Sequence, residues 1–121
     1  MKKILIIDDE PQILMVSATR LKANGYAVST AFSGEQGLDK ARKEIPDLVL
    51  LDHVMPEMDG AEVLECLKND PITKHIPVII FTADVHKVKE VEFQARGAAG
   101  CFYKPFFSEE LLARVKEILD K

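Results

Sequence analysis

Acidic side chains follow two short apolar runs of the sequence, and a hydroxyl and an ammonium group follow two others. Asp8 and Asp9 come directly after the first run, and Asp52 follows the third. Thr82 follows the fourth run, and Lys104 follows the fifth. If each run is a strand of one parallel sheet, these five side chains gather at one edge of that sheet, because the carboxyl ends of parallel strands lie together.

Three carboxylates at one edge of a sheet would repel one another. At a spacing of about 5 Å, each like-charge pair costs roughly 3 kcal/mol at an effective dielectric constant near 20. Such a cluster takes up protons or binds a cation, and Lys104 offsets only one of the charges. Carboxylates, water and substrate phosphate are the ligands that Mg²⁺ prefers. The set includes no thiolate or imidazole cluster, which argues against zinc.

The residue types also indicate how the roles divide. Asp52 stands alone at its strand end and could act as a carboxylate nucleophile toward a phosphoryl group. Asp8 and Asp9 are placed to hold Mg²⁺, which neutralises charge on a phosphoryl group in transfer. Lys104 supplies a point charge for one phosphoryl oxygen, and the Thr82 hydroxyl donates a hydrogen bond to another. This combination predicts an aspartyl phosphate at Asp52.

The elements that position these residues alternate between apolar strands and amphipathic helices. Strands are predicted at 4–7, 27–32, 48–51, 78–81 and 101–103, and helices after Pro11, from a Ser33 cap through about 44, over 61–68, over 85–96 and after a Ser108 cap. Five strand–helix units in series indicate a parallel sheet covered on both faces. Right-handed crossovers favour a doubly wound, flavodoxin-like α/β fold with strand order 2-1-3-4-5.

Length and composition bound the class of protein. The chain has 121 residues, so we expect one domain spanning 1–121. Hydrophobic residues make up 47% and charged residues 30%, as in globular domains. The net charge of −4 disfavours a nucleic acid as direct partner. No apolar run approaches the roughly 20 residues of a membrane span, and the apolar start is too short for a signal peptide, so we expect a cytoplasmic protein.

The two cysteines give no sign of a disulfide framework or a metal site. Cys66 and Cys101 form no CxxC pair. Both stand in apolar stretches of sequence, so we expect both to be buried as small hydrophobic side chains.

Four motifs occur in order along the whole chain. They are Ile6-Ile7-Asp8-Asp9-Glu10, Leu51-Asp52 followed by Met55-Pro56 and Asp59-Gly60, Phe81-Thr82-Ala83, and Lys104-Pro105-Phe106. Together they resemble a response-regulator receiver domain of two-component signalling. The resemblance implies that Asp52 accepts phosphate from a sensor histidine kinase or a histidine phosphotransfer protein. It further implies that Asp9 binds Mg²⁺ directly, that Asp8 helps partly through water, and that the backbone carbonyl of Val54 completes the metal shell.

The same resemblance implies a phosphorylation-switched signalling module. Such a domain catalyses only its own phosphorylation and slow dephosphorylation, so it is not a turnover enzyme for a metabolite. The chain ends one helix after Lys104, so we expect no output domain and a signal passed to a downstream protein target by contact. The last two helices and the fifth strand offer a face for a homodimer.

One position departs from the family pattern. The family usually has Tyr or Phe three residues before the lysine, and this chain has Cys101 there. Strand alternation places Phe102 on the opposite face, and Tyr103 shares the face of Cys101 but is displaced by two residues. We therefore expect the output to be carried mainly by the loop after Thr82 and by the helix over 85–96.

Further positions near the acceptor have predicted roles. The resemblance points to Val54 and Asp84, two residues past Asp52 and Thr82, as residues that set the lifetime of the phosphate. The apolar side chain of Val54 cannot orient an attacking water, which predicts slow self-dephosphorylation. His53 adjoins the acceptor, but alternation along the strand should turn it away from the pocket.

Two other functions stay open at this point. A phosphatase of the haloacid dehalogenase type also forms an aspartyl phosphate with Mg²⁺. Its nucleophile follows the first strand with a second Asp two residues on, where this chain has Glu10. A degenerate receiver would bind partners as a phosphate-independent scaffold, although every acceptor, metal, Thr and Lys position is filled here.

Overall fold

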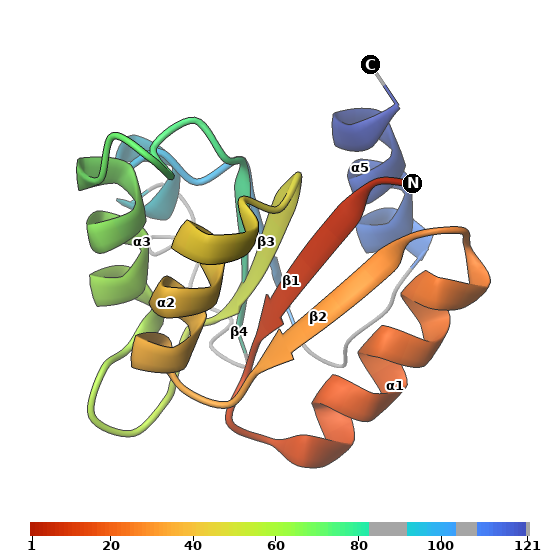
Figure 1. Ribbon diagram of the computed structural model, residues 1–121, viewed down its shortest axis with the longest axis horizontal. Coiled ribbons are helices and arrows are strands. Elements are labelled where there is room, and N and C mark those ends of the chain that lie inside the picture. Colours follow the sequence, from red (N-terminus) through yellow and green to blue (C-terminus); the bar gives the residue numbers. More distant parts are fainter. Residues whose placement is uncertain (83–91, 104–108, 121) are drawn as a thin grey trace.

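A single parallel sheet forms the centre of the molecule (Figure 1). The computed structural model describes residues 1–82, 92–103 and 109–120, with Thr82 and Tyr103 described by their backbone alone. The strands are β1 (Lys3–Ile7), β2 (Ala27–Ala31), β3 (Leu48–Asp52), β4 (Val78–Thr82) and β5 (Gly100–Tyr103). Their order in the sheet is β2-β1-β3-β4-β5, and all four pairings are parallel. The predicted fold class and strand order are confirmed.

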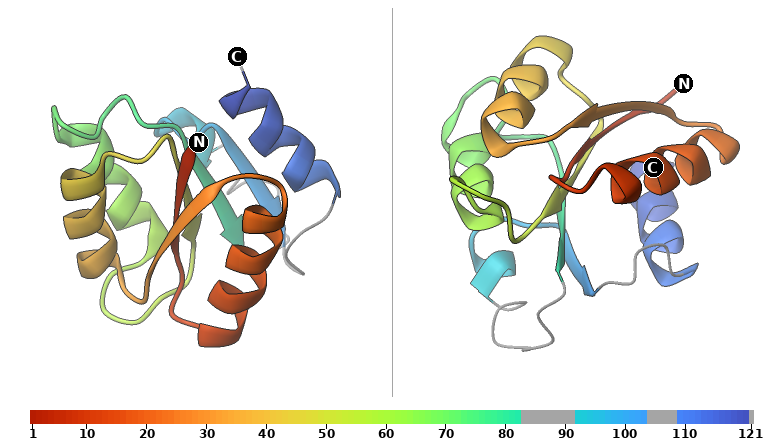
Figure 2. Two further views of the ribbon diagram at one scale, coloured as in Figure 1. Left: turned by 45° about the vertical axis from the view of Figure 1, so that its right-hand side comes forward. Right: turned by 90° about the horizontal axis from the view of Figure 1, so that it is seen from below.

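Helices cover both faces of the sheet. The described helices are α1 (Pro11–Ala23), α2 (Gly34–Glu44), α3 (Gly60–Asn69) and α5 (Glu109–Leu119). Figure 2 shows α2 and α3 on one face and α1 and α5 on the other. The predicted helix over 85–96 falls largely outside the described residues, and 92–95 are helical. The Ser108 cap also lies outside them.

The strands consist of nearly continuous runs of apolar residues, because both faces of the sheet are buried. Alternate side chains enter two separate cores. Leu5 and Ile7 of β1 pack toward α2 and α3, whereas Ile4 and Ile6 pack toward α1 and α5. All four side chains are fully buried, so the sheet forms a rigid base for the residues that follow its strands.

Side-chain caps fix where the helices begin beside the carboxyl ends of the strands. The Ser33 hydroxyl accepts a hydrogen bond from the Gln36 N–H at 3.1 Å, as the sequence predicted. The Gln36 side chain accepts in turn from the N–H of Phe32 at 2.6 Å, one residue earlier than in a capping box. Asp59 caps α3 by accepting from the Glu62 N–H at 3.0 Å.

The expectation for Cys66 was wrong, whereas Cys101 is buried. Cys66 lies on α3 one residue before the buried Leu67, and a step of about 100° along the helix carries it off the buried stripe. Apolar neighbours in sequence therefore did not give it an apolar environment.

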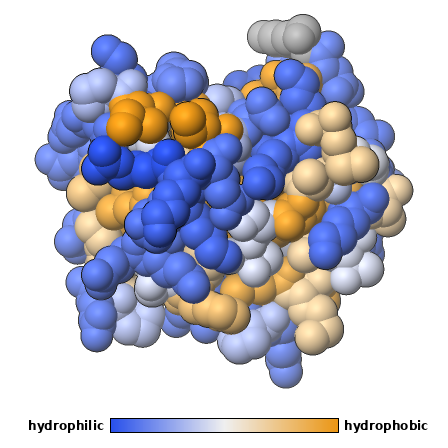
Figure 3. All heavy atoms as spheres, in the orientation of Figure 1, coloured by the Kyte–Doolittle hydropathy of each residue, from blue (hydrophilic) through white to orange (hydrophobic). Residues whose placement is uncertain are grey.

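The molecular surface is mostly hydrophilic on the face shown in Figure 3, with small separate apolar groups. The exposed apolar side chains of the described residues include Met15, Val16 and Phe32. Among the described helices, none is both long and apolar enough to cross a membrane.

A polar cluster connects the start of β1 with the end of α2. It lies at the amino-terminal ends of the strands, whereas the acidic residues lie at the carboxyl ends. Glu44 forms an ion pair with Lys3 at 3.1 Å and accepts a hydrogen bond from Ser29 at 3.3 Å. Partial burial raises the pKa of the Glu44 carboxyl. The hydrogen bonds from Lys3 and Ser29 and the charges of Lys3 and Lys40 outweigh this effect, so the pKa lies below its usual range.

We expect Glu44→Gln to lower the free energy of unfolding by up to about 1 kcal/mol at pH 7. A carboxyl whose pKa is lowered by folding contributes stability above the unfolded pKa of about 4.3, and this contribution is lost as the pH falls through the lowered folded value. Urea unfolding at neutral pH and near pH 3 measures the difference. The curves of the two proteins should converge in acid, and a difference that is constant with pH would contradict the assignment.

Candidate functional site

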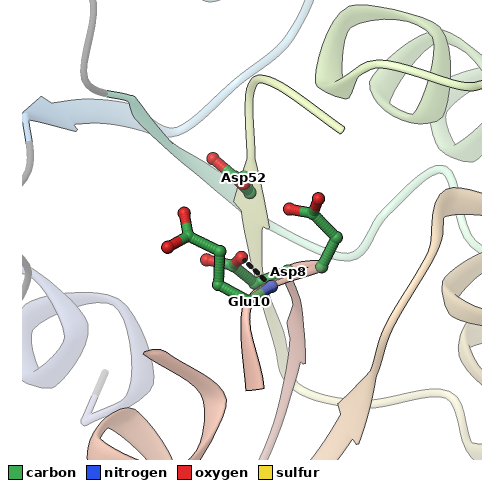
Figure 4. A group of neighbouring side chains, drawn as sticks. Asp8, Glu10 and Asp52 are labelled. Atoms are coloured by element: carbon green, nitrogen blue, oxygen red, sulfur yellow. Dashed lines mark hydrogen bonds between the residues drawn. The ribbon is translucent and has the colours of Figure 1, made fainter. Parts of the chain in front are cut away.

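The carboxyl ends of β1 and β3 bring four carboxylates together (Figure 4). Asp8, Asp9, Glu10 and Asp52 each offer one oxygen, and these oxygens all lie within 4.8 Å of one another. The two strands are adjacent and parallel, with Ile7 paired to Leu51. The residues that follow this pair therefore meet at one edge of the sheet, although more than forty positions separate them in the chain.

Burial differs sharply among the four acids. Asp8 is 0% exposed and Asp52 is 2% exposed, whereas Asp9 is half-buried and Glu10 is exposed. Burying a carboxylate costs free energy unless hydrogen bonds or opposite charge compensate it. Two buried acids side by side are therefore an arrangement typical of a functional site rather than of a structural one.

The backbone around Asp8 holds its carboxylate in place. The Asp8 N–H donates to the carbonyl of Ala31 at 3.1 Å, which extends the pairing of β1 with β2 by one residue. One Asp8 oxygen, Oδ1, accepts a hydrogen bond from the N–H of Glu10 at 2.9 Å. This local turn fixes the side chain and leads directly into α1, where Pro11 occupies the first turn.

The end of β3 is held equally firmly. The His53 N–H donates to the Phe81 carbonyl at 3.0 Å, and the His53 carbonyl accepts from the Gly60 N–H at 2.7 Å. A Cβ added at Gly60 would lie 2.5 Å from the Asp52 carbonyl oxygen and 2.8 Å from the His53 Cα. Only glycine lets α3 begin this close to the strand that carries Asp52. Gly60 was noted in the sequence only as part of the Asp59-Gly60 motif, and this contact was not predicted.

The His53 side chain points away from the acidic cluster, as strand alternation predicted. It is 9% exposed, and its ring packs edge-on against Phe93, with centroids 5.0 Å apart and an interplanar angle of 80°. His53 is therefore part of the packing between β3 and the segment that precedes β5.

Other residues that the sequence singled out have different surroundings. The Val54 side chain is 67% exposed, two residues past Asp52. Cys101 is buried in the core beneath α2 and α3, and Phe102 packs against the opposite core. The alternation predicted for β5 is thus confirmed, whereas the switch roles of these residues stay predictions.

Several predicted site residues fall outside the part of the chain that the structure describes. Thr82 ends β4, and its backbone is paired with Tyr103 of β5, but neither side chain is described. Asp84 and Lys104 lie outside the described ranges altogether. Their predicted contacts to a phosphoryl group remain predictions.

The donor set of the cluster fits a hard divalent cation. All four groups are carboxylates, and among the described residues no histidine or cysteine joins them. Oxygen ligands of this kind suit Mg²⁺ or Ca²⁺ rather than zinc. Sequence reasoning missed Glu10 as a member. Its position directly after Asp8 and Asp9 was the available signal.

The structure thus combines a five-stranded parallel sheet with an acidic cluster at the ends of β1 and β3. The family described as "Response regulator receiver domain" matches residues 4–116, and the chain belongs to this family. The protein is therefore a receiver domain of two-component signalling, a class that is not made of metabolite-converting enzymes. Membership decides against the haloacid dehalogenase alternative.

Named relatives and a solved structure agree with this assignment. The chain is 38% identical over 116 residues to the response regulator PleD of Caulobacter vibrioides, covering 96% of this chain and 26% of PleD. It is 40% identical over 118 residues to the transcriptional regulatory protein PhoP of Bacillus subtilis, covering 98% of this chain and 48% of PhoP. The chain thus spans a quarter to a half of the length of these relatives.

The fold closely matches a solved chemotaxis protein. The crystal structure of CheY4 of Vibrio cholerae superposes with a TM-score of 0.91 and 34% sequence identity, covering 98% of this chain and 99% of that one.

Proposed function

We propose that this receiver domain accepts a phosphoryl group on Asp52 from a phosphohistidine of a sensor kinase or a phosphotransfer protein. The observation that carries the proposal is the burial of Asp52 beside Asp8, inside a group of four carboxylates at the sheet edge. We assign Mg²⁺ to this group, held by Asp8, Asp9, Asp52 and the carbonyl of Val54. We further propose that the protein acts in the cytoplasm.

In this proposal, an Asp52 carboxylate oxygen attacks the phosphorus atom. The new bond is P–O, the P–N bond to the donor histidine breaks, and the histidine nitrogen keeps the electron pair. When bound, Mg²⁺ supplies positive charge to the phosphoryl oxygens and to the crowded acids. Thr82 donates a hydrogen bond to one phosphoryl oxygen, and Lys104 pairs with another. The hydrogen-bonded backbone beside Asp52 supports the proposal, because it holds the nucleophilic carboxylate in a fixed position.

Phosphorylation then biases an equilibrium between inactive and active conformations. It adds roughly −1.5 to −2 charges and new hydrogen-bond acceptors to the sheet edge. We propose that the segment after Thr82, including Asp84, responds to this change, with Cys101 and Tyr103 tuning the response. The signal passes to a downstream protein by contact, and a homodimer through β5 and the helices beside it is one form that the active state could take.

Incubation with a small acyl phosphate, with Mg²⁺ or with a chelator, tests the proposal. Intact-mass measurement should show one added phosphoryl group only when Mg²⁺ is present. Reduction of the acyl phosphate and peptide mapping should then locate it at Asp52. Phosphate at another residue, or none with Mg²⁺ present, would overturn the assignment and favour a phosphate-independent scaffold.

The side chain of Val54 should prolong the life of the phosphate. It is exposed beside the acceptor, where an apolar group cannot orient water for attack. We expect Val54→Asn to speed self-dephosphorylation on the order of tenfold, which is less than a full general base supplies. Decay of the phosphorylated protein, followed with Val54→Ala as the apolar control, measures this effect. Equal decay rates in the asparagine and alanine variants would refute it.

A further inference from the structure

Glu10 is the one carboxylate of the cluster that the family resemblance assigns to no role. Its oxygen lies within 4.8 Å of those of Asp8, Asp9 and Asp52, and Figure 4 shows its side chain beside Asp52 and Asp8. Glu10 occupies the N-cap position of α1, yet its side chain makes no capping hydrogen bond. The side chain is exposed, so it approaches the cluster from the solvent side.

The size and hydration of a cation determine how many of the four oxygens it contacts directly. Mg²⁺ binds oxygen at roughly 2.1 Å in an octahedron, so two ligands on opposite sides are roughly 4.2 Å apart. Ca²⁺ binds at roughly 2.3–2.6 Å, which allows a separation of roughly 4.6–5.2 Å. The four oxygens all lie within 4.8 Å of one another, which is within the range that direct ligands of Ca²⁺ can occupy. All four carboxylates are therefore close enough together to contact Ca²⁺ directly. Mg²⁺ usually keeps several waters and binds only one or two carboxylates, so we expect it to reach some of these acids through water.

The exposed acid is the one that faces the water shell of a bound ion. Asp8 is buried, and one of its oxygens accepts the Glu10 N–H, so its position is fixed from the protein side. The Glu10 side chain is longer by one methylene group and lies on the open side. Mg²⁺ gives up its water reluctantly and usually keeps several molecules, whereas Ca²⁺ accepts six to eight oxygen ligands in a flexible shell.

Resting on the proposed function that this cluster binds a divalent cation, we propose that Glu10 determines which cation the site prefers. It holds Mg²⁺ through a bound water and contacts Ca²⁺ directly with its carboxylate. Glu10 is thus a specificity-determining residue of the metal site. Removing its charge should weaken Ca²⁺ more than Mg²⁺.

Titration calorimetry of the full chain with Mg²⁺ alone and with Ca²⁺ alone tests this inference. For Glu10→Gln we expect the Kd for Mg²⁺ to rise about tenfold and the Kd for Ca²⁺ to rise roughly 100-fold, because a direct ligand is lost only from Ca²⁺. Glu10→Asp keeps the charge but shortens the reach, so Ca²⁺ binding should stay weak. Glu35→Gln, an equal charge change at an exposed position of α2, should alter neither Kd.

The possible outcomes distinguish a failure of metal binding by the cluster from a failure of the role proposed for Glu10. If the unmodified protein binds no Mg²⁺, the proposed function fails, and this inference fails with it. If it binds Mg²⁺ and Glu10→Gln leaves both Kd values unchanged, only the role of Glu10 is overturned. Equal weakening of both cations with full recovery in Glu10→Asp would reduce Glu10 to a distant charge and would also overturn the inference.

Discussion

Asp52→Asn is expected to abolish phosphorylation while making the metal-free protein more stable. The substitution removes the nucleophilic oxygen, so the phosphorylation rate should fall by on the order of 10⁴-fold or more. It also removes a negative charge from a position that is 2% exposed and close to three other carboxylates. Like-charge repulsion falls as a result, and we expect the free energy of unfolding to rise by about 1 kcal/mol without metal.

The two effects of Asp52→Asn have separate measurements. Phosphorylation is followed by intact mass with a small acyl phosphate, and stability by urea unfolding in a chelator and in Mg²⁺. The gain in stability should shrink in Mg²⁺, because the ion stabilises the unmodified protein more. Glu65→Gln, which removes an exposed charge on α3, serves as the control and should change neither property. A variant that is less stable without metal would show that repulsion does not dominate at Asp52.

Gly60→Ala should have the second-largest effect, because the new Cβ would collide with backbone atoms. It would lie 2.5 Å from the Asp52 carbonyl oxygen and 2.8 Å from the His53 Cα. Neither atom can rotate away as a flexible side chain could, so β3 or α3 must shift. We expect a loss of about 2–4 kcal/mol in the free energy of unfolding. Displacement of Asp52 should also slow phosphorylation on the order of 10²-fold.

Gly100→Ala is the matched control for this experiment. Its Cβ would meet the ring of Phe102 at 3.3 Å and the Arg114 Nε at 3.9 Å, both of which are side-chain atoms that can yield. We expect a change within about 1 kcal/mol and normal phosphorylation. Unfolding curves and phosphorylation rates of both variants settle the comparison. Similar behaviour of the two would mean that the contact at Gly60 does not position the acceptor.

The strands and the proximity of the acidic side chains were predictable from the sequence, because both follow from general rules for parallel sheets. Runs such as Ile4–Ile7 and Leu48–Leu51 have no polar side, which is typical of strands buried on both faces. The parallel arrangement then requires that Asp8 and Asp52 follow adjacent strands at the same edge. No knowledge of side-chain packing was needed for this step.

The parts that were missed depend on packing or on helical phase. Glu10 directly follows Asp8 and Asp9, but an exposed glutamate at a helix start usually contacts solvent or interacts with the helix dipole, so its membership of the cluster was not predicted. The role of Gly60 depends on how closely α3 approaches β3, which the Asp59-Gly60 motif does not specify. Cys66 has apolar neighbours in sequence, but its exposure follows from its angular position on α3.

If the ends of β1 and β3 form one divalent cation site around Asp52, residues of both segments should respond to the same binding event. The chain has no tryptophan, so the backbone amide signals in nuclear magnetic resonance are the suitable probe during a Mg²⁺ titration. We predict that the amides of Asp8, Asp9 and Glu10 shift together with those of 52–54, along one binding curve with one Kd. Shifts confined to one of these two segments, or to the exposed acids of α3, would contradict the account.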